Sequence, residues 1–315
     1  MNFSIPPQRV SSQRGVALLV ALLVVALATV LIAGLLDRGE LTAARTRNQL
    51  RAEQAAAYTQ GLEAYAARVL SQDQANGGNF DAADDVWALP LPPTPVPGGQ
   101  IMATMSDLNG RFNLNNLDRK FDTQQIWSGK FKLLLGALKL DPTVADNVAA
   151  WMNADPAASP GDAWYLAQTV PYRAAKRPFN HVSELRLIKG VDGDVYARLA
   201  PYVSALPEGT PINVNTASVP VLMTLSPSMT EEMAQSIWQQ GHAHFKNTND
   251  VTTAQPTLHA IQCQPCYDVQ SSYFLARGEI TLDGLPFVFY SLIERRTAGP
   301  GGGIRVIQRS RGADG

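Results

Sequence analysis

Two cysteines and three histidines stand near one another in the C-terminal third of the chain. Cys263 and Cys266 form a C-x-x-C run, and His242, His244 and His259 precede it. Thiolate and imidazole are the ligands of tetrahedral zinc, but this spacing matches no strong zinc pattern. A redox-active pair would have its first cysteine at a helix N-terminus in a βαβ context, which this region lacks. We predict a short-loop disulfide between Cys263 and Cys266 in an oxidising compartment, with zinc as the alternative.

A loop in the middle of the chain offers oxygen ligands for a metal. Asn153, Asp155 and Asp162 lie close together in the sequence, with Gly161 before the last of them. Calcium is held by carboxylate and amide oxygens supplied by loops. Calcium binding at these three residues is one interpretation. In the other, Asp155 and Asp162 cap helices or turns.

A site for proteolysis lies at Gly15 and Val16. A short basic leader, Met1–Gly15, precedes the uncharged apolar run Val16–Leu36. At about 1.5 Å per residue, a helix of this length crosses the roughly 30 Å hydrocarbon layer of a bilayer. A secretory signal has a shorter apolar region followed by a cleavage site, whereas a plain single-pass anchor fits the length and the basic flank. The glycine immediately before the run resembles a type IV prepilin or pseudopilin, which implies cleavage between Gly15 and Val16 on the cytoplasmic side.

No group of side chains in the sequence indicates an enzyme active site. The sequence shows no nucleophile with a recognisable base and no phosphate-binding glycine loop, so we predict no enzymatic activity; a membrane-anchored hydrolase is the alternative, because catalytic triads are spatial. Lys and Arg number 26 against 27 Asp and Glu, which leaves no basic field for nucleic acid or anionic lipid. The 315 residues, 45% of them hydrophobic, suffice for a substantial core and for more than one domain.

The elements that must position these residues begin with one long helix. Beyond the apolar run, Asp37–Gln74 contains no proline and is rich in good helix formers, so the helix is expected to continue out of the membrane and to end by Asn76–Gly78. Its outer part must pack on something, because four apolar residues recur there at helical spacing. They are Tyr58, Leu62, Tyr65 and Val69.

Strand signals occur on both sides of the middle of the chain. Trp87–Gly99 is so rich in proline that we expect a loop without regular structure. Gln100–Ser106 and Arg111–Leu114 read as strands of a hairpin that turns at Asn109-Gly110. Near the C-terminus, three further strands are predicted, the first two joined at Asp283-Gly284. They are Ser272–Leu282, Leu285–Arg295 and Gly303–Gln308.

A mainly helical section, roughly Thr123–Asp268, separates the two groups of strands and is too long to be a loop. We interpret it as an inserted helical domain. Its predicted helices are Ile126–Leu140, Val144–Met152, Val182–Lys189, Asp194–Tyr202, Ala217–Leu225 and Thr230–Gln240.

Two hairpins in this section resemble helix-hairpin-helix units, at Gly190–Gly193 and Ile212–Ala217. Such units bind DNA through backbone N–H groups beside an excess of Lys and Arg. Here three basic residues are balanced by three acidic ones, so we predict packing or protein contact and no nucleic acid. A membrane-anchored DNA receptor of the competence type is the alternative. The six residues are Arg186, Lys189, Arg198, Glu184, Asp192 and Asp194.

Four segments together resemble the landmarks of the type II secretion minor pseudopilin K family. The resemblance covers nearly the whole chain in order, including the leader. It implies an α+β fold, in which a long N-terminal helix lies on a small antiparallel sheet that carries a large inserted α-domain. The segments are Gly110–Asn115 (GRFNLN), Pro171–Ala175 (PYRAA), Val182–Arg186 (VSELR) and Pro211–Ser218 (PINVNTAS).

The resemblance also implies a place in an assembly. Most pilins carry Glu at the fifth mature position, where it pairs with the α-amino group of a neighbouring subunit; here that position is Val20. A subunit without this glutamate belongs at the tip of a pseudopilus, with the I and J minor pseudopilins as partners, followed by H and the major pseudopilin G. A minor pilin of a type IV pilus is an alternative.

Further expectations follow from the same family. Prepilin peptidase cleaves the leader, Val16 is N-methylated, and the chain meets the inner-membrane secretion platform. The family carries a calcium-binding loop where Asn153, Asp155 and Asp162 stand, although this loop has lost part of its acidic cluster. The expected location is the inner membrane, crossed once, with the N-terminus cytoplasmic and the globular region periplasmic.

The predicted domain organisation follows from these elements. The leader, 1–15, precedes the N-terminal helix, 16–75, of which 16–36 is transmembrane. The sheet is split into 76–122 and 269–309 by the inserted α-domain, 123–268, and 310–315 forms a tail.

Overall fold

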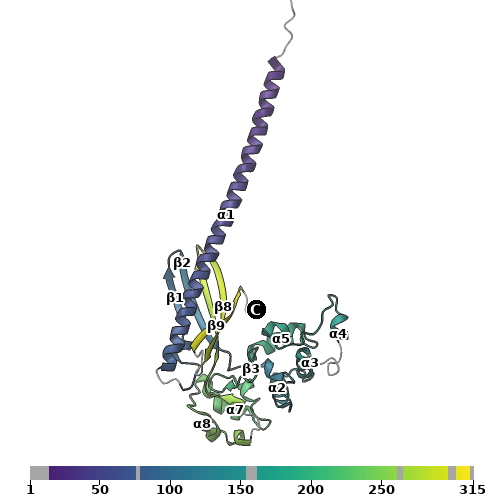
Figure 1. Ribbon diagram of the computed structural model, residues 1–315, viewed down its shortest axis with the longest axis vertical. Helices are drawn as coiled ribbons and strands as arrows, with labels where there is room; N and C mark the ends of the chain where they lie inside the picture. The colour runs from purple at the N-terminus through teal and green to yellow at the C-terminus, as the bar shows by residue number, and fades with distance from the viewer. Residues whose placement is uncertain (1–13, 76–78, 154–161, 261–264, 297–302, 313–315) are drawn as a thin grey trace, which may run out of the picture. The chain divides into compact units, whose positions relative to one another are not determined.

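The computed structural model describes residues 14–75, 79–153, 162–260, 265–296 and 303–312 (Figure 1). The chain divides into two compact units, Met1–Ala56 and Ala57–Gly315. All of the strands and all but one of the helices in the described residues belong to the second unit.

Helix α1 runs from Arg14 to Ala75 without interruption. The predicted long helix is therefore confirmed, whereas its predicted end at Asn76–Gly78 lies outside the described residues. Within the described part of the chain, α1 is the one helix long and apolar enough to cross a membrane. All side chains from Val16 to Leu36 are exposed in this structure, which contains no membrane.

A five-stranded antiparallel sheet forms the first layer of the second unit, in the order β1-β2-β7-β8-β9. Its strands are β1 (Leu91–Val96), β2 (Gly99–Asp107), β7 (Tyr273–Leu282), β8 (Leu285–Arg296) and β9 (Gly303–Arg311). The three C-terminal strands confirm the prediction. Asp283 and Gly284 both have positive φ, 48° and 80°, as a tight type I′ hairpin turn requires.

The helical section is inserted between two strands that are neighbours in the sheet. β2 pairs with β7 over its full length, from Gly99 opposite Leu282 to Asp107 opposite Phe274. The chain thus leaves the sheet at the end of β2 and returns to the adjacent position at the start of β7. The sheet remains continuous across the insertion, in agreement with the predicted fold class.

Two predictions about the first strands are wrong. The proline-rich segment forms strand β1, which is possible because β1 lies at the edge of the sheet and bonds to β2 alone, with an irregularity between Leu91 and Thr94. Asn109-Gly110 does not turn a hairpin. The next strand, β3 (Phe112–Asn113), pairs in parallel with β4 (Val203–Ser204) instead. Gly110 is required by close packing, since a Cβ there would lie 2.6 Å from Thr216 Oγ1.

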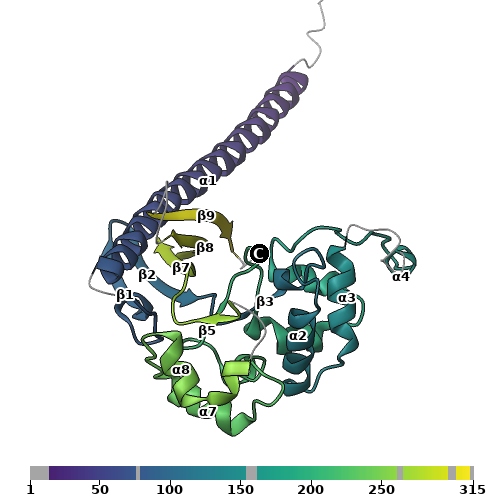
Figure 2. The ribbon, with the colours of Figure 1, turned by 60° about the horizontal axis from the view of Figure 1, so that its bottom comes forward.

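The helical section contains seven α-helices among its described residues, and its core is one large apolar cluster around Phe112 and Phe131. α2 and α3 lie side by side in both views, as do α7 and α8, and Figure 1 shows α5 next to α2 and α3 (Figures 1 and 2). Two short strands, β5 (Ile212–Asn213) and β6 (Tyr267–Asp268), form a second parallel pair. The helices are α2 (Ile126–Ala137), α3 (Thr143–Met152), α4 (Ala163–Leu166), α5 (Gly193–Leu199), α6 (Val219–Leu222), α7 (Glu231–Trp238) and α8 (Thr248–Ala254).

Several predicted helices are shorter than expected. Val182–Leu187 is a 3-10 helix, which precedes α5, and the predicted helix from Ala217 to Leu225 retains only α6 as regular α-helix. α8 lies in a segment where no helix was predicted. Its N-cap, Asn247, accepts a hydrogen bond from the N–H of Asp250 at 3.0 Å, and Val251 anchors it in the core.

The Ala57–Ala75 part of α1 packs on the sheet through a narrow stripe. Leu62, Ala66 and Leu70 are buried, the last two beside Phe274 and Ile293. The predicted stripe is only partly right, because Tyr65 is 51% exposed. The helix approaches the sheet closely at β7, where a Cβ on Gly278 would lie 2.9 Å from Leu62 Cδ1.

Candidate functional site

The candidate assembly element is the first part of α1. Gly15 and Val16 lie in the first turn of the helix, while the leader up to Gln13 is outside the described residues. Val20 is 53% exposed, and the apolar run around it contains no acidic side chain. Cleavage between Gly15 and Val16 and methylation of Val16 stay predictions. What the sequence and the helix establish is an uncharged helical segment whose fifth residue after Gly15 cannot supply a carboxylate.

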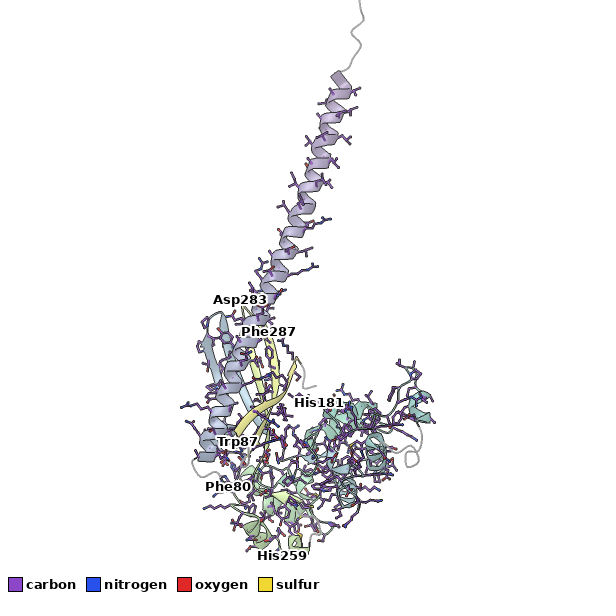
Figure 3. All side chains as sticks on the ribbon, in the orientation of Figure 1. Phe80, Trp87, His181, His259, Asp283 and Phe287 are labelled. Carbon is purple, nitrogen blue, oxygen red and sulfur yellow. The ribbon has the colours of Figure 1, made fainter. Side chains whose placement is uncertain are left out.

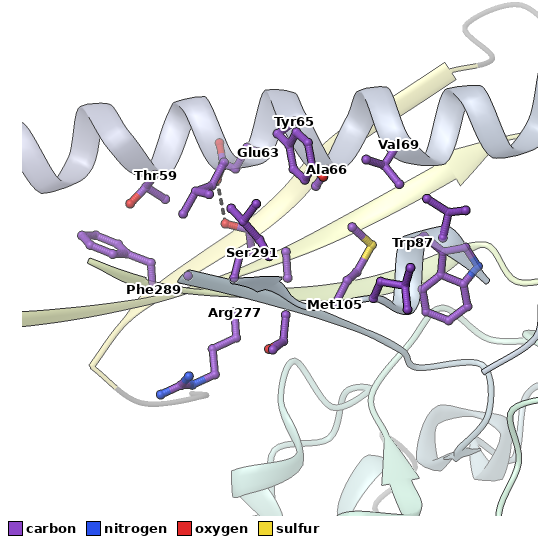
Figure 4. Close-up of a pocket in the computed structure, with 18 residues that line it drawn as sticks. Thr59, Glu63, Tyr65, Ala66, Val69, Trp87, Met105, Arg277, Phe289 and Ser291 are labelled. Carbon is purple, nitrogen blue, oxygen red and sulfur yellow. Dashed lines mark hydrogen bonds between the residues drawn. The ribbon is translucent and has the colours of Figure 1, made fainter. Parts of the chain in front are cut away.

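An ion pair between a buried glutamate and an exposed arginine joins the Ala57–Ala75 part of α1 to the sheet. The Glu63 carboxylate on α1 accepts hydrogen bonds from Arg309 Nε at 2.7 Å and from Ser291 Oγ at 2.7 Å. Figure 4 shows the contact between Glu63 and Ser291. Burial raises the pKa of Glu63, but these hydrogen bonds outweigh it and hold that pKa below its usual range. The sequence did not reveal this contact, because Arg309 is 246 residues away.

A second buried network surrounds Arg295 of β8, which is 2% exposed. Its guanidinium donates to Asp73 Oδ2 at 3.2 Å, to the Asp81 carboxylate, and to the carbonyl of Ser271 at 2.8 Å. Burial raises the pKa of Asp81 to about 6 and also raises that of Asp73. These contacts bind the end of α1 to the segment that precedes β7.

The point where the chain leaves the sheet is held by Asp107, at the end of β2. Its Oδ2 accepts hydrogen bonds from Thr216 Oγ1, from Ser271 Oγ at 2.6 Å and from Asn213 Nδ2 at 3.1 Å. Burial raises the pKa of Asp107. Asp107 therefore joins the exit from the sheet, the return to the sheet, and β5 of the helical section.

Two asparagines, one in each of two segments named in the sequence analysis, hold a distant backbone as a clamp, with both ends of the side-chain amide. Asn115 Oδ1 accepts from the N–H of Phe179 at 2.7 Å, and its Nδ2 donates to the Phe179 carbonyl at 3.0 Å. Asn215 makes the same two bonds to Phe245, at 2.9 Å and 3.0 Å. Asn113 and Asn213, two residues earlier, each accept from the N–H of the clamping asparagine.

These clamps define an internal repeat. In each half the first asparagine of an Asn-x-Asn segment is the last residue of a short strand in a parallel pair. The clamped phenylalanine precedes a helix N-cap by two residues, His181 in one half and Asn247 in the other. In the sequence, these segments are identified by a family resemblance, which does not predict their contacts. The sequence does contain a sign of the repeat, because the Asn-x-Asn pattern occurs in both segments.

The predicted calcium ligands are only partly described. Asn153 is the C-cap of α3, Asp162 precedes α4, and Asp155 lies outside the described residues. Asp162 Oδ1 accepts a hydrogen bond from the N–H of Ala174 at 3.2 Å, and its Oδ2 lies 3.3 Å from Arg173 Nη1 and 3.8 Å from Lys176 Nζ. The Ala174 bond, together with the two cations, lowers the pKa of Asp162. Both oxygens of this carboxylate thus already face a protein N–H group or a cationic side chain.

The predicted disulfide and the alternative zinc site fall in a region that is also partly described. Cys266 is 1% exposed and takes part in a disulfide, but Cys263 lies outside the described residues, so the pairing stays a prediction. His244 Nε2 lies 2.7 Å and His242 Nδ1 3.5 Å from the carboxylate of Asp84. Within the described residues, no group of three His, Cys, Asp or Glu side chains could hold a metal ion.

Charged side chains in and beside the hairpin between the 3-10 helix and α5 make contacts within the protein. Gly190 has φ of +83°, Asp192 caps α5 by accepting from the N–H of Val195 at 2.8 Å, and the Arg186 guanidinium lies 4.2 Å above the ring of Tyr196. These contacts favour packing over phosphate binding.

Comparison with known proteins decides between the families that the chain could belong to. Two family models, both described as type II secretion system (T2SS), protein K, match residues 110–208 and 212–272. The type II secretion system protein K of Pseudomonas aeruginosa is 38% identical over 96% of this chain and 94% of its own length. The chain belongs to the type II secretion system protein K family. The family protein from Pectobacterium carotovorum subsp. carotovorum is 32% identical over 96% of this chain and 97% of its own length.

A solved structure agrees with this family membership. The protein K chain in the GspK-GspI-GspJ complex of the enterotoxigenic Escherichia coli type 2 secretion system has a TM-score of 0.72 and 28% identity to this chain. The match covers 85% of this chain and 99% of that one. The predicted family and fold class are confirmed. This member of the protein K family is a minor pseudopilin of type II secretion, and neither a DNA receptor nor a type IV pilus subunit is favoured.

Proposed function

We propose that this minor pseudopilin occupies the tip of the type II secretion pseudopilus and initiates its assembly. The observation that carries the proposal is the valine at position 20, within the part of α1 from Val16 to Leu36 that contains no charged residue. A glutamate at this depth in the membrane is costly unless an amino group of a neighbouring subunit pairs with it. A subunit with valine has no carboxylate to pair with the α-amino group of a subunit above it. It still offers its own α-amino group to the glutamate of a subunit below.

The inserted helical section supports the same position. It occupies most of the chain between β2 and β7, while the sheet itself stays small and continuous. A helical array of closely packed subunits repeats every contact along its length. An insertion of this size is most easily accommodated where no further subunit follows.

The partners at this position are the I and J minor pseudopilins. The structural neighbour of 28% identity was solved in a complex with GspI and GspJ, and it supports the same assembly for this chain. H and the major pseudopilin G then follow below, and the inner-membrane platform adds subunits at the base. Membership in the protein K family supports a structural role, and we assign no enzymatic activity to the chain.

Processing and location follow from α1 and the leader. Prepilin peptidase cleaves between Gly15 and Val16, and Val16 is then methylated. The single apolar helix anchors the chain in the inner membrane, with the N-terminus in the cytoplasm and Ala57–Gly315 in the periplasm. A disulfide at Cys266 fits an oxidising compartment.

Calcium at Asn153, Asp155 and Asp162 is a weaker part of the proposal. A calcium ion needs several oxygen ligands, and both oxygens of Asp162 already accept or face protein donors. Calcium therefore competes with Arg173 and Lys176 for this carboxylate, and its affinity is expected to be low.

Co-expression tests the proposed assembly. The full chain is produced with I and J from the same secretion system and purified from membranes through a tag on this chain. The proposal predicts a complex with one copy of each protein. Purification of this chain in complex with copies of itself, without I and J, would contradict it.

A further inference from the structure

Strand β9 forms one edge of the sheet and is open to a further strand. Among the described strands it pairs with β8 alone, so alternate residues turn their backbone N–H and C=O groups outward. The N–H of Gly312 donates to the carbonyl of Val288 at 2.8 Å, which places the N–H of the preceding Arg311 on the outer side. The opposite edge, β1, carries three prolines and offers few donors.

The edge is positively charged. β9 contains Arg305, Arg309 and Arg311 and no acidic residue. The first two are paired with Glu294 and Glu63, yet 57% and 60% of their side chains remain exposed. Because a guanidinium has five N–H donors, a paired arginine can still bind a further carboxylate. The edge therefore suits an acidic partner.

A hollow adjoins this edge on the face of the sheet that points away from α1. Phe274 and Ile293 pack in the cluster beneath α1, and the residues next to them, Leu275 and Leu292, face the other way. These two leucines line an open hollow, together with Gln308 of β9. His181 and β4 form the opposite wall, where His181 lies at the border between sheet and helical section (Figure 3).

One buried hydroxyl in the wall of the hollow lacks a partner. Ser204 is 1% exposed, and among the described residues its Oγ makes no hydrogen bond. A buried hydroxyl without a partner costs free energy, and most such groups in folded proteins are satisfied. A ligand with an apolar body and a polar end, such as a tyrosine side chain, would fill the hollow and bond to this hydroxyl.

We propose that the outer edge of β9 and this hollow together bind an extended acidic segment of a partner protein. The segment adds to the sheet as a further strand beside β9, and one tyrosine-like side chain enters the hollow toward Ser204. In strand addition, main-chain hydrogen bonds give affinity and a side-chain pocket gives specificity. The site is separate from the apolar helix on which the proposed tip position depends.

Peptide binding to the full chain in detergent micelles tests this surface. The probe is the peptide EVEYEVE, which is fluorescently labelled and capped at both ends, and its binding is measured by fluorescence anisotropy. We expect saturable binding, abolished when the peptide is N-methylated at alternate residues on the edge that pairs. The lysine analogue KVKYKVK should not bind. Equal binding by the N-methylated peptide, or no binding of EVEYEVE, would overturn the proposal.

Two sets of variants locate the site. Arg311→Pro removes an outward N–H and a guanidinium, whereas its matched control, Arg311→Ala, removes only the guanidinium; the proline variant should bind more weakly than the alanine variant. The Tyr-containing peptide should bind about fivefold tighter than EVEFEVE, the size expected for one hydrogen bond, and Ser204→Ala should remove that preference. Equal binding by both Arg311 variants, or a preference for Tyr that survives Ser204→Ala, would contradict this placement.

Discussion

Asn115 holds the backbone of Phe179 with both ends of its side-chain amide, although 64 residues separate the two. Both residues are buried, so water cannot readily replace the two bonds. The equivalent contact between Asn215 and Phe245 shows that the helical section is built twice on one plan. The side-chain amides of Asn115 and Asn215 thus hold the segments around Phe179 and Phe245 next to the short strands β3 and β5.

The first prediction concerns this clamp. Asn115→Ala leaves the N–H and C=O of Phe179 buried without partners, so it should lower the free energy of unfolding by about 2–4 kcal/mol. All five tryptophans lie beyond Ala57, so their fluorescence during urea unfolding of the full chain in detergent reports on this unit. The exposed Asn249→Ala is the control and should change stability by less than about 0.5 kcal/mol. Equal effects of the two changes would show that the clamp contributes nothing.

The second prediction is a pH dependence that arises at Asp81. Its folded pKa, about 6, lies above the ordinary value of 3.8, so the folded chain binds a proton that the unfolded chain releases. The stabilisation is complete below the unfolded pKa and is lost as the pH rises through about 6. Asp73 and Asp107 act in the same direction. From pH 7 to pH 5, stability should rise by about 1 kcal/mol.

The Asp81→Asn variant checks the origin of that effect. Between pH 7 and pH 5 its unfolding free energy should change less than that of the wild type. The exposed Asp146→Asn should keep the wild-type slope. If the unfolding free energy of Asp81→Asn depended on pH as strongly as that of the wild type, a group other than Asp81 would have to bind the proton.

The third prediction concerns the leader. Gly15 immediately precedes the apolar run, so Gly15→Val should leave an uncleaved precursor in the membrane when prepilin peptidase is present. Mass spectrometry of the wild-type protein should find a methylated N-terminus at Val16. A mature N-terminus near Ala28 would instead identify an ordinary signal peptide.

The fourth prediction concerns calcium. A ligand that binds only the folded chain raises its melting temperature, so millimolar calcium should stabilise the wild type if Asn153, Asp155 and Asp162 bind it. Arg173→Ala removes a competitor of calcium for Asp162 and should enlarge the shift. Asp162→Asn should abolish it. No shift in the wild type and in Arg173→Ala would remove calcium from the account.

Local patterns predicted the elements whose causes are local. The long α1, the turn at Asp283-Gly284 and the C-terminal strands all follow from helix propensity, turn chemistry and alternation within a few residues. β1 was missed because proline argues against a strand in general, and the sequence does not show that this strand lies at an edge.

Long-range contacts account for the other differences. Asn109-Gly110 has the local signature of a turn, but Asn109 Oδ1 accepts from the N–H groups of Ser272 and Tyr273, and the glycine makes room for Thr216. Buried polar networks such as the one around Arg295 join residues that are more than two hundred positions apart. Only the fold brings such groups together, so sequence patterns marked these segments without revealing their function.

The tip position is tested most directly by crosslinking from the apolar helix. Single cysteines are placed in Val16–Leu36, one at Val20 and one on the opposite helix face at Leu22, in a chain whose own Cys263 and Cys266 are changed to serine. Crosslinks are formed in membranes that contain the complete secretion system, and the captured partners are identified. The account predicts crosslinks to the I and J minor pseudopilins. Crosslinks predominantly between copies of this chain, or to the major pseudopilin along the whole filament, would contradict a position at the tip.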